Sequence, residues 1–214
     1  MSNLHSQPSA AQAWKGALQN VNFRVQFIVT MILLASFTFI FKHFFDFVES
    51  RSGTGLYDVV LANIPAYDVS WGVFFILYSA ILIGIITHRA HPKTVLIIFQ
   101  TYILVTFVRM VTITLIPLEP PVGYLPLREP VVQFFTNGGK IISKDLFFSG
   151  HVSTVMSVYL GTHLLRTRTV LFFCVVAICI LLLVQHVHYT VDVIAALPAT
   201  CLVYKFCKKF LGGK

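Results

Sequence analysis

The sequence predicts an all-α, polytopic membrane protein: a bundle of six transmembrane helices with both termini in the cytoplasm. Three observations support this fold class. Hydrophobic residues make up 57% of the 214-residue chain and charged residues only 11%, whereas a soluble domain averages about 25% charged residues. Six apolar stretches are each close to the ~20 residues that a helix needs to cross a bilayer. The charges between these stretches are also unevenly distributed across the membrane.

The first element is a short polar segment, residues 1–22, which lacks the apolar core of a secretory signal and is expected to be cytoplasmic. The six-helix membrane domain then occupies residues 23–207, and a basic cytoplasmic tail, residues 208–214, follows it. Very short turns separate the last three spans, so we expect these to pack as antiparallel neighbours. The predicted spans are residues 25–45, 71–87, 95–117, 146–165, 169–187 and 188–207.

The distribution of the charged residues predicts the orientation of the spans in the membrane. An even number of spans places both termini on one side, and that side carries most of the lysines and arginines and no acidic residue. Because Lys and Arg concentrate on the cytoplasmic face of membrane proteins, the termini are predicted to be cytoplasmic and the long loops extracytoplasmic. The net charge of +8 is therefore a topology signal. No basic patch on a soluble face is evident, so no nucleic-acid partner is expected.

Polar residues from three predicted spans fall near the extracytoplasmic surface. Arg109 lies in the outer part of the third span, and His151 lies about one turn into the fourth. His188 opens the sixth span, and Asp192 follows one turn later. Charges inside membrane spans are rare and suggest function by default. The common depth of these side chains predicts one site in the outer leaflet.

The spacing of His188 and Asp192 places both on one helix face, because residues i and i+4 are neighbours there. The carboxylate can then hold the imidazole in one tautomer and leave its other nitrogen free as a nucleophile or base. His151 comes from another helix and is a candidate general acid. These three residues are the predicted catalytic set.

A phosphate group is the ligand that the remaining polar residues suit best. The planar guanidinium of Arg109 matches phosphate oxygens. Ser149 and Gly150 lie at the first turn of a predicted helix, where backbone N–H groups bind anions. Lys144 and Asp145, just before this helix, fit either a solvated loop pair or a supporting part of the site. The chain has no acidic cluster suited to magnesium and no metal-type cysteine spacing, so no metal or other cofactor is expected.

Three motifs carry a family resemblance. The segments FSGHVS (148–153), HVHYTVDV (186–193) and RMVTITLIPLEPP (109–121) together resemble the sphingomyelin synthase branch of the type-2 phosphatidic acid phosphatase superfamily. Asp145 is similar to the acidic residue that precedes the Ser-Gly-His element of the family. The resemblance covers the third to sixth predicted spans by motif, and the first two by hydropathy alone.

The resemblance implies a six-helix enzyme with an outward-facing triad and no cofactor. It implies that His188 attacks phosphorus to form a phosphohistidine, that Asp192 orients it, and that His151 protonates the departing alcohol. A phosphate-linked headgroup would then pass from a phospholipid donor to ceramide or diacylglycerol as acceptor. Leu181 and Leu182 occupy the positions at which phosphatase members of the superfamily carry Ser-Arg, and this difference favours the synthase branch.

Other functions remain open at this point. Water as the acceptor would make the protein a lipid phosphate phosphatase. From another class, His151 and His188 are candidate haem ligands, and His with Asp inside a membrane can also relay protons in a transporter. A haem site leaves Asp192 and Arg109 unexplained, and the sequence shows no broken helices in repeated halves of the kind that would support a transporter. His186 and Tyr189, beside His188, fit either a supporting role or a plain loop position.

Overall fold

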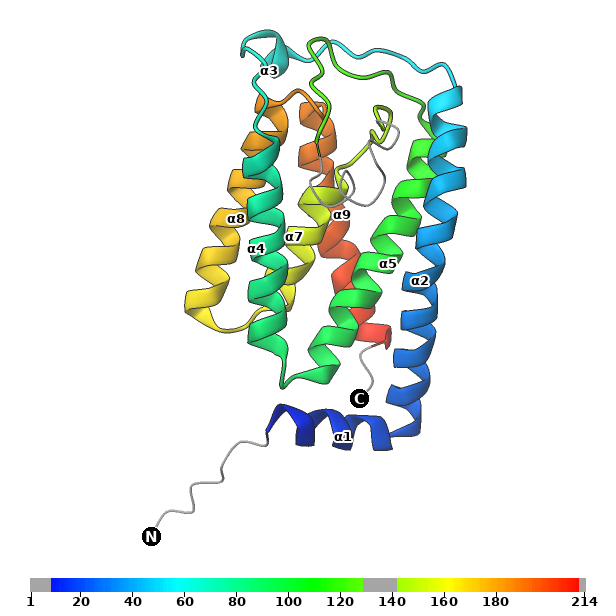
Figure 1. Ribbon diagram of the computed structural model, residues 1–214, viewed down its shortest axis with the longest axis vertical. Coiled ribbons are helices and arrows are strands. Elements are labelled where there is room, and N and C mark those ends of the chain that lie inside the picture. Colours follow the sequence, from blue (N-terminus) through cyan, green and yellow to red (C-terminus); the bar gives the residue numbers. More distant parts are fainter. Residues whose placement is uncertain (1–8, 129–141, 212–214) are drawn as a thin grey trace.

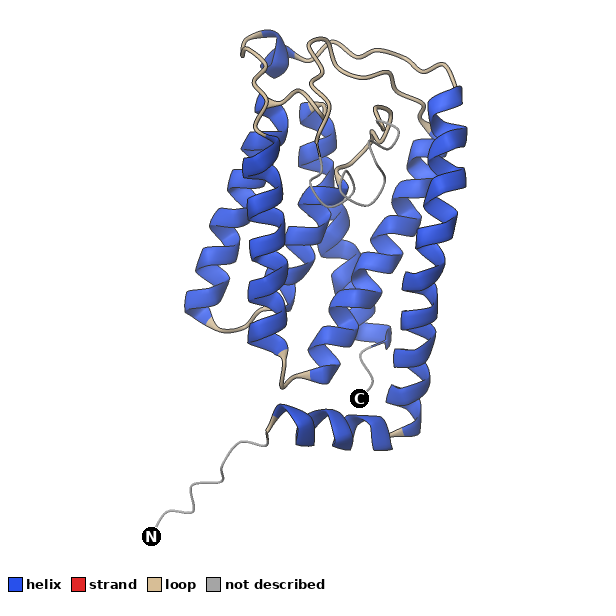
Figure 2. Cartoon of the chain, viewed as in Figure 1, coloured by secondary structure: helices blue, strands red, loops and turns tan. Residues whose placement is uncertain are grey.

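The structure is a computed structural model that describes residues 9–128 and 142–211. Residues 1–8 and 212–214 of the predicted terminal segments, and Glu129 and Lys140 of the predicted outer loop, lie outside the described residues. Within the described ranges the protein is helical and contains no β-strand (Figure 2). The helices are α1 (Ala10–Gln19), α2 (Val21–Ser50), α3 (Val59–Ala62), α4 (Ser70–His88), α5 (Pro92–Leu115), α7 (Gly150–Gly161), α8 (Leu165–Val184) and α9 (Thr190–Phe206), which continues as a π-helical turn, Cys207–Leu211.

The long helices form a bundle along one axis, with α1 crossing its lower end and α3 at its upper end (Figure 1). Helix α7 is central and packs against α4, α5, α8 and α9, while α2 packs on α5. The core lies around α7, where Val152 and Val155 are fully buried with Ile178 and Leu182 of α8 and Ala196 of α9. The helix that begins with the Ser-Gly-His motif is therefore enclosed by the other helices.

The prediction of an all-helical, polytopic membrane protein is confirmed, but six spans are not. Among the described residues, four helices are long and apolar enough to cross a membrane: α4, α5, α8 and α9 with its π-helical turn. A fifth candidate joins α1 to the first part of α2, with a bend of 102° between them. The predicted fourth span is the clearest difference, because α7 has only 12 residues. At 1.5 Å per residue it is about 18 Å long, short of the ~30 Å hydrocarbon core.

Backbone conformation explains why α7 begins later than the predicted span, which is one cause of its shortness. Phe147 and Phe148 have φ angles of 73° and 48°, in the left-handed region that a right-handed helix cannot include. Ser149 then caps the helix, and its hydroxyl oxygen accepts a hydrogen bond from the backbone N–H of Val152 at 3.4 Å. The apolar residues just before the motif therefore enter the site as a loop, and Leu146 is buried there.

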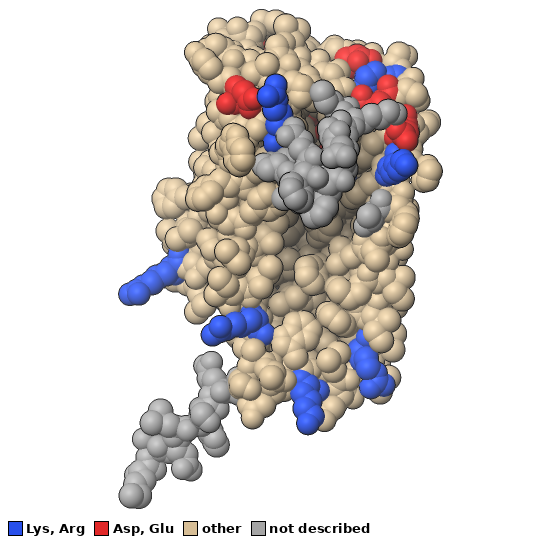
Figure 3. Space-filling view, in the orientation of Figure 1, with Lys and Arg blue, Asp and Glu red and all other residues tan. Residues whose placement is uncertain are grey.

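The loops at the upper end carry the acidic residues. On the face shown in Figure 3, Asp and Glu side chains gather near the upper end, whereas only Lys and Arg occur toward the lower end. The upper end contains α3, the loop before α7 and the start of α9 (Figure 1). The predicted charge difference between the two sides therefore corresponds to the two ends of one bundle.

Candidate active site

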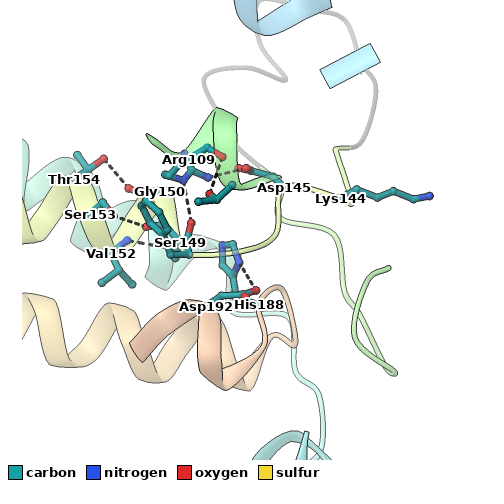
Figure 4. A network of polar contacts seen from close by, with 12 residues as sticks. Arg109, Lys144, Asp145, Ser149, Gly150, Val152, Ser153, Thr154, His188 and Asp192 are labelled. Atoms are coloured by element: carbon teal, nitrogen blue, oxygen red, sulfur yellow. Dashed lines mark hydrogen bonds and ion pairs between the residues drawn. The ribbon is translucent and has the colours of Figure 1, made fainter. Parts of the chain in front are cut away.

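Arg109 is held near the outer end of α5 by groups from the loop before α7. Its Nε donates to the carbonyl oxygen of Phe148 at 2.9 Å, and its Nη2 donates to Asp145 Oδ1 at 2.6 Å. The guanidinium also lies directly against Gly150, where an added Cβ would collide with it. Figure 4 shows Arg109 facing Asp145 beside the first residues of α7. The arginine is thus fixed at a helix N-terminus, and only glycine leaves room for it there.

Asp145 is the acidic partner in this pair and stays ionised. Burial by itself would raise the pKa of its carboxyl group. The positive charge and hydrogen bond of Arg109, with contributions from His188 and His151, outweigh that effect and bring the pKa below its usual value. Since both imidazoles act on the same carboxyl group, the two histidines and the arginine share one electrostatic environment.

His188 and Asp192 form the second half of the site. His188 Nδ1 lies 3.4 Å from Asp192 Oδ2, and the two side chains are 2% and 0% exposed. His188 does not open a helix as predicted, because Tyr189 caps α9 and Thr190 begins it. The pair still forms, since Asp192 Oδ2 reaches back and accepts a hydrogen bond from the backbone N–H of Tyr189 at 3.1 Å. The carboxylate is thereby aimed at Nδ1, and Nε2 is the ring nitrogen that does not face it.

A main-chain hydrogen bond joins the two halves. The backbone N–H of Ser149 donates to the carbonyl oxygen of Asp192 at 3.2 Å, so the start of α7 is attached to the first turn of α9. His151 follows on α7, with its ring edge-on to Phe74 at a centroid distance of 5.9 Å. Its Nδ1 is buried and has no hydrogen-bond partner among the described residues. Such an unpaired buried group calls for an explanation, and a bound ligand would supply one.

A cavity of about 190 Å³ lies between α2, α4, α5 and α7, and we call it the upper cavity. Arg109, Asp145, Gly150 and His151 line its polar end. His188 and Asp192 are not among its lining residues, although Asp192 is attached to the adjacent Ser149. The remaining lining residues are Phe41, Phe45, Leu77, Tyr102, Val105, Thr106, Ser153, Thr154 and Ser157.

Asp58 is a site residue that the sequence interpretation missed. Its Oδ2 accepts from the backbone N–H of Thr190 at 2.6 Å, and its Oδ1 accepts from the Thr190 hydroxyl at 2.9 Å. Burial opposes ionisation, but the hydrogen bonds from Thr190, Leu61 and Val60 bring the pKa of Asp58 below its usual value. The carboxylate thus attaches the short helix α3 to the start of α9. The only sequence signal was an acidic residue in an outer loop, with nothing to indicate a partner 132 positions away.

Tyr189 belongs to the same attachment. Its phenol donates to the carbonyl oxygen of Glu119 at 3.0 Å and accepts from the backbone N–H of Leu56 at 3.0 Å. Its ring is buried against Leu118 and Leu146. Tyr189 therefore holds the segment that carries His188 against two outer loops, and its hydroxyl does not contact the His188–Asp192 pair.

Lys144 points away from Arg109, as Figure 4 shows. Its Nζ donates to the carbonyl oxygen of Arg51 at 2.5 Å and pairs with Glu119 at 2.9 Å. Its backbone N–H donates to Glu49 Oε1 at 2.7 Å. Lys144 thus fastens the loop that carries Asp145 to the outer ends of α2 and α5.

His186 makes its contacts with the loop that follows α5. It has a φ of 54°, and its Nδ1 lies 2.9 Å from the carbonyl oxygen of Val122. The neighbouring Gly123 packs against the ring, also with a positive φ. These contacts place His186 in the turn between α8 and α9, beside the loop that follows α5.

Comparison with known proteins finds a family match in the C-terminal part of the chain. Residues 144–209 match the family model described as PAP2 superfamily C-terminal. The matched region runs from the Lys144–Asp145 pair through both histidine motifs to the end of α9. No curated protein matches the chain. The family match supports the type-2 phosphatidic acid phosphatase superfamily and, with it, phosphatase or phosphotransferase activity on phosphoesters.

Proposed function

Starting from that superfamily, we propose that the protein is a lipid phosphotransferase that moves a phosphate-linked headgroup between lipids through a phosphohistidine, in the manner of sphingomyelin synthases. The donor is a phospholipid, and the acceptor is ceramide or diacylglycerol. The active site opens on the extracytoplasmic side. Arg109 binds the phosphate oxygens together with the backbone N–H group of Gly150 at the start of α7. The N–H group of Ser149 is already bonded to Asp192, so Ser149 contributes by capping this helix start.

In the first step, His188 Nε2 attacks phosphorus, and the bond from phosphorus to the diacylglycerol oxygen breaks. His151 donates a proton to that departing oxygen. Asp192 stabilises the positive charge that develops on the His188 ring, because its carboxylate contacts Nδ1. The products of this step are diacylglycerol and a phosphohistidine that carries the headgroup.

In the second step, His151 removes the proton from the hydroxyl group of the acceptor. The acceptor oxygen attacks phosphorus, the phosphorus–nitrogen bond breaks, and His188 returns to its neutral form. A lipid alcohol gives transfer, and water gives hydrolysis. The upper cavity favours transfer, because the phenylalanines and leucine that line it suit a lipid alcohol better than water.

The observation that carries this proposal is the buried His188–Asp192 pair, attached by a main-chain hydrogen bond to the helix start that holds Arg109. A haem site or a proton pathway requires no anion-binding arginine at that point. Phosphoryl transfer through histidine requires a nucleophile, an orienting carboxylate, an acid and an anion site, and each has a candidate here.

The test is an assay of purified protein in lipid vesicles with labelled phospholipid donors and fluorescent ceramide or diacylglycerol. We expect a new acceptor-derived phospholipid together with diacylglycerol, and release of a water-soluble headgroup phosphate would indicate the phosphatase instead. His188→Ala is expected to abolish turnover, whereas His43→Ala, at an exposed histidine of α2, leaves it unchanged. Normal turnover by His188→Ala would exclude this mechanism.

A further inference from the structure

A second cavity of about 340 Å³ lies between α2, α4, α5 and α7, and we call it the lower cavity. Its walls are almost entirely apolar, with Leu34 of α2, Ile81 of α4 and Val95 of α5 among them. The lower cavity lies toward the end of the bundle where α4 meets α5, away from the outer loops (Figure 1). The mechanism proposed above makes no use of it.

The two cavities adjoin each other, because Leu77, Tyr102, Thr154 and Ser157 line both of them. Together they extend from the polar end of the upper cavity to the base of the lower one, and we call the two together the passage. On α5 the lining extends from Arg109 down to Val95. Fourteen residues of α-helix at 1.5 Å each give a passage about 21 Å long.

This length corresponds to a long hydrocarbon chain. Carbon–carbon single bonds of about 1.5 Å in an extended zigzag advance about 1.25 Å per carbon, so about 16 or 17 carbons span the passage. At the base, His88 lines the cavity, and its Nε2 lies 3.0 Å from the hydroxyl of Thr162, so a polar pair ends the apolar passage. The side is open, since Ile85 lines the cavity and is 60% exposed. A chain can therefore enter from the bilayer.

We infer that the combined passage holds one hydrocarbon chain of the lipid whose phosphate binds at Arg109, and that the His88–Thr162 pair at its base limits the length of that chain. This inference rests on the proposed function, because the chain enters together with the phosphate. The shared lining of the two cavities supports this occupant, because a chain attached to a phosphate at Arg109 would start at the polar end of the passage.

The passage is expected to select hydrocarbon chains by their length and shape. Bilayer hydrocarbon is as apolar as the cavity walls, so moving a chain from lipid into the cavity gains little hydrophobic free energy. The wall has little room to widen at Gly84, where α4 approaches α7 so closely that an added Cβ would lie 2.6 Å from Val158. A bulky side chain in the lower cavity is therefore expected to exclude long chains without affecting chains that end above it.

The first test fills the lower cavity with Ile81→Trp and uses Ile86→Trp as the matched control. Ile86 is on the same helix, is 56% exposed and does not line the cavity. Substrates carry the same headgroup on chains of about eight or about sixteen carbons, and the shorter chain reaches only to about the level of Tyr102. We expect Ile81→Trp to lower kcat/KM at least about tenfold for the long chain and less than about twofold for the short one, with Ile86→Trp near wild type.

Equal losses for both chain lengths in Ile81→Trp, or no loss for either, would overturn the inference. If Ile81→Trp does not fold, Leu34→Trp fills the same cavity from α2 and is held to the same criterion. A similar fall in kcat/KM for the long-chain substrate in the Ile86→Trp control would also count against the inference, because that side chain faces the lipid.

The second test does not depend on turnover. A phospholipid with a photoreactive group at the end of a sixteen-carbon chain is expected to label wild-type protein near Val95 and His88, and the label should be lost in Ile81→Trp. A triacylglycerol with the same photoreactive chain should label these residues several-fold less, and equal labelling would mean that bulk lipid fills the passage. Labelling without any turnover would overturn the proposed function alone, whereas turnover without labelling would overturn this inference alone.

Discussion

Replacing Asp192 by asparagine tests the catalytic pair directly. The carboxylate contacts His188 Nδ1 at 3.4 Å in a buried setting, and it also accepts from the backbone N–H of Tyr189. Asparagine retains an oxygen for Tyr189, so the start of α9 is expected to stay folded. What it loses is the negative charge beside an imidazole that becomes positive when Nε2 bonds to phosphorus.

The size of this effect can be worked from the distance. Opposite unit charges 3.4 Å apart interact by about 5 kcal/mol at an effective dielectric constant of about 20. Because each 1.36 kcal/mol of barrier is a factor of ten, the expected loss in kcat is between about three and four powers of ten.

The assay is single-turnover headgroup transfer in vesicles, with trapping of the phosphoenzyme and thermal unfolding measured on the same samples. We expect unchanged unfolding, no trapped phosphohistidine and the predicted fall in rate. A rate within about tenfold of wild type in a normally folded Asp192→Asn protein would show that the carboxylate does not support the nucleophile.

Further predictions concern the groups around this pair. Arg109→Lys replaces the planar guanidinium, which can donate two parallel hydrogen bonds, by a compact ammonium group, so kcat/KM for lipid phosphates should fall about 10- to 100-fold. An unchanged value would show that Arg109 does not bind the phosphate. Gly150→Ala places a methyl group against the Arg109 guanidinium and should reduce both activity and stability, the latter by about 1–3 kcal/mol, whereas Gly16→Ala, with open space around it, should reduce neither. The pKa of Asp58 is lowered in the folded protein, so its contribution to stability is present above its usual value of 3.8 and is lost as the pH falls through the folded value. The midpoint of thermal unfolding should therefore fall further on acidification in wild type than in Asp58→Asn. Equal pH dependence of the two midpoints would contradict this role. Turnover should persist in EDTA, because the proposed route uses side chains alone, and a loss that a divalent ion restores would contradict it.

Much of the site could be predicted from local sequence. Hydropathy and loop charge placed the motifs near one end of the bundle, and a spacing of four residues paired His188 with Asp192. The pair lies at the start of a helix and not within one, because α9 begins after His188. The spacing still brings the two groups together, because a carboxylate in the first turn reaches back to the residues before it. Local chemistry was sufficient there.

Contacts between distant segments could not be predicted. The bond from Thr190 to Asp58 joins residues 132 positions apart, and no periodicity connects them. The shortness of α7 depends on positive φ angles at Phe147 and Phe148, which phenylalanine rarely adopts and hydropathy does not register. The position of Lys144 depends on where the ends of α2 and α5 lie, which is a property of the folded bundle.

The hydrogen bond from Ser149 to Asp192 has a consequence for how the protein can vary. Both of its atoms are main chain, so exchanging either side chain leaves the bond in place. Side chains on α7 or α9 can therefore differ between related sequences while this hydrogen bond keeps the two helices aligned. Proline at position 149 is the exception, since it has no N–H to donate, and it would separate the nucleophile from the anion site without removing any reacting side chain.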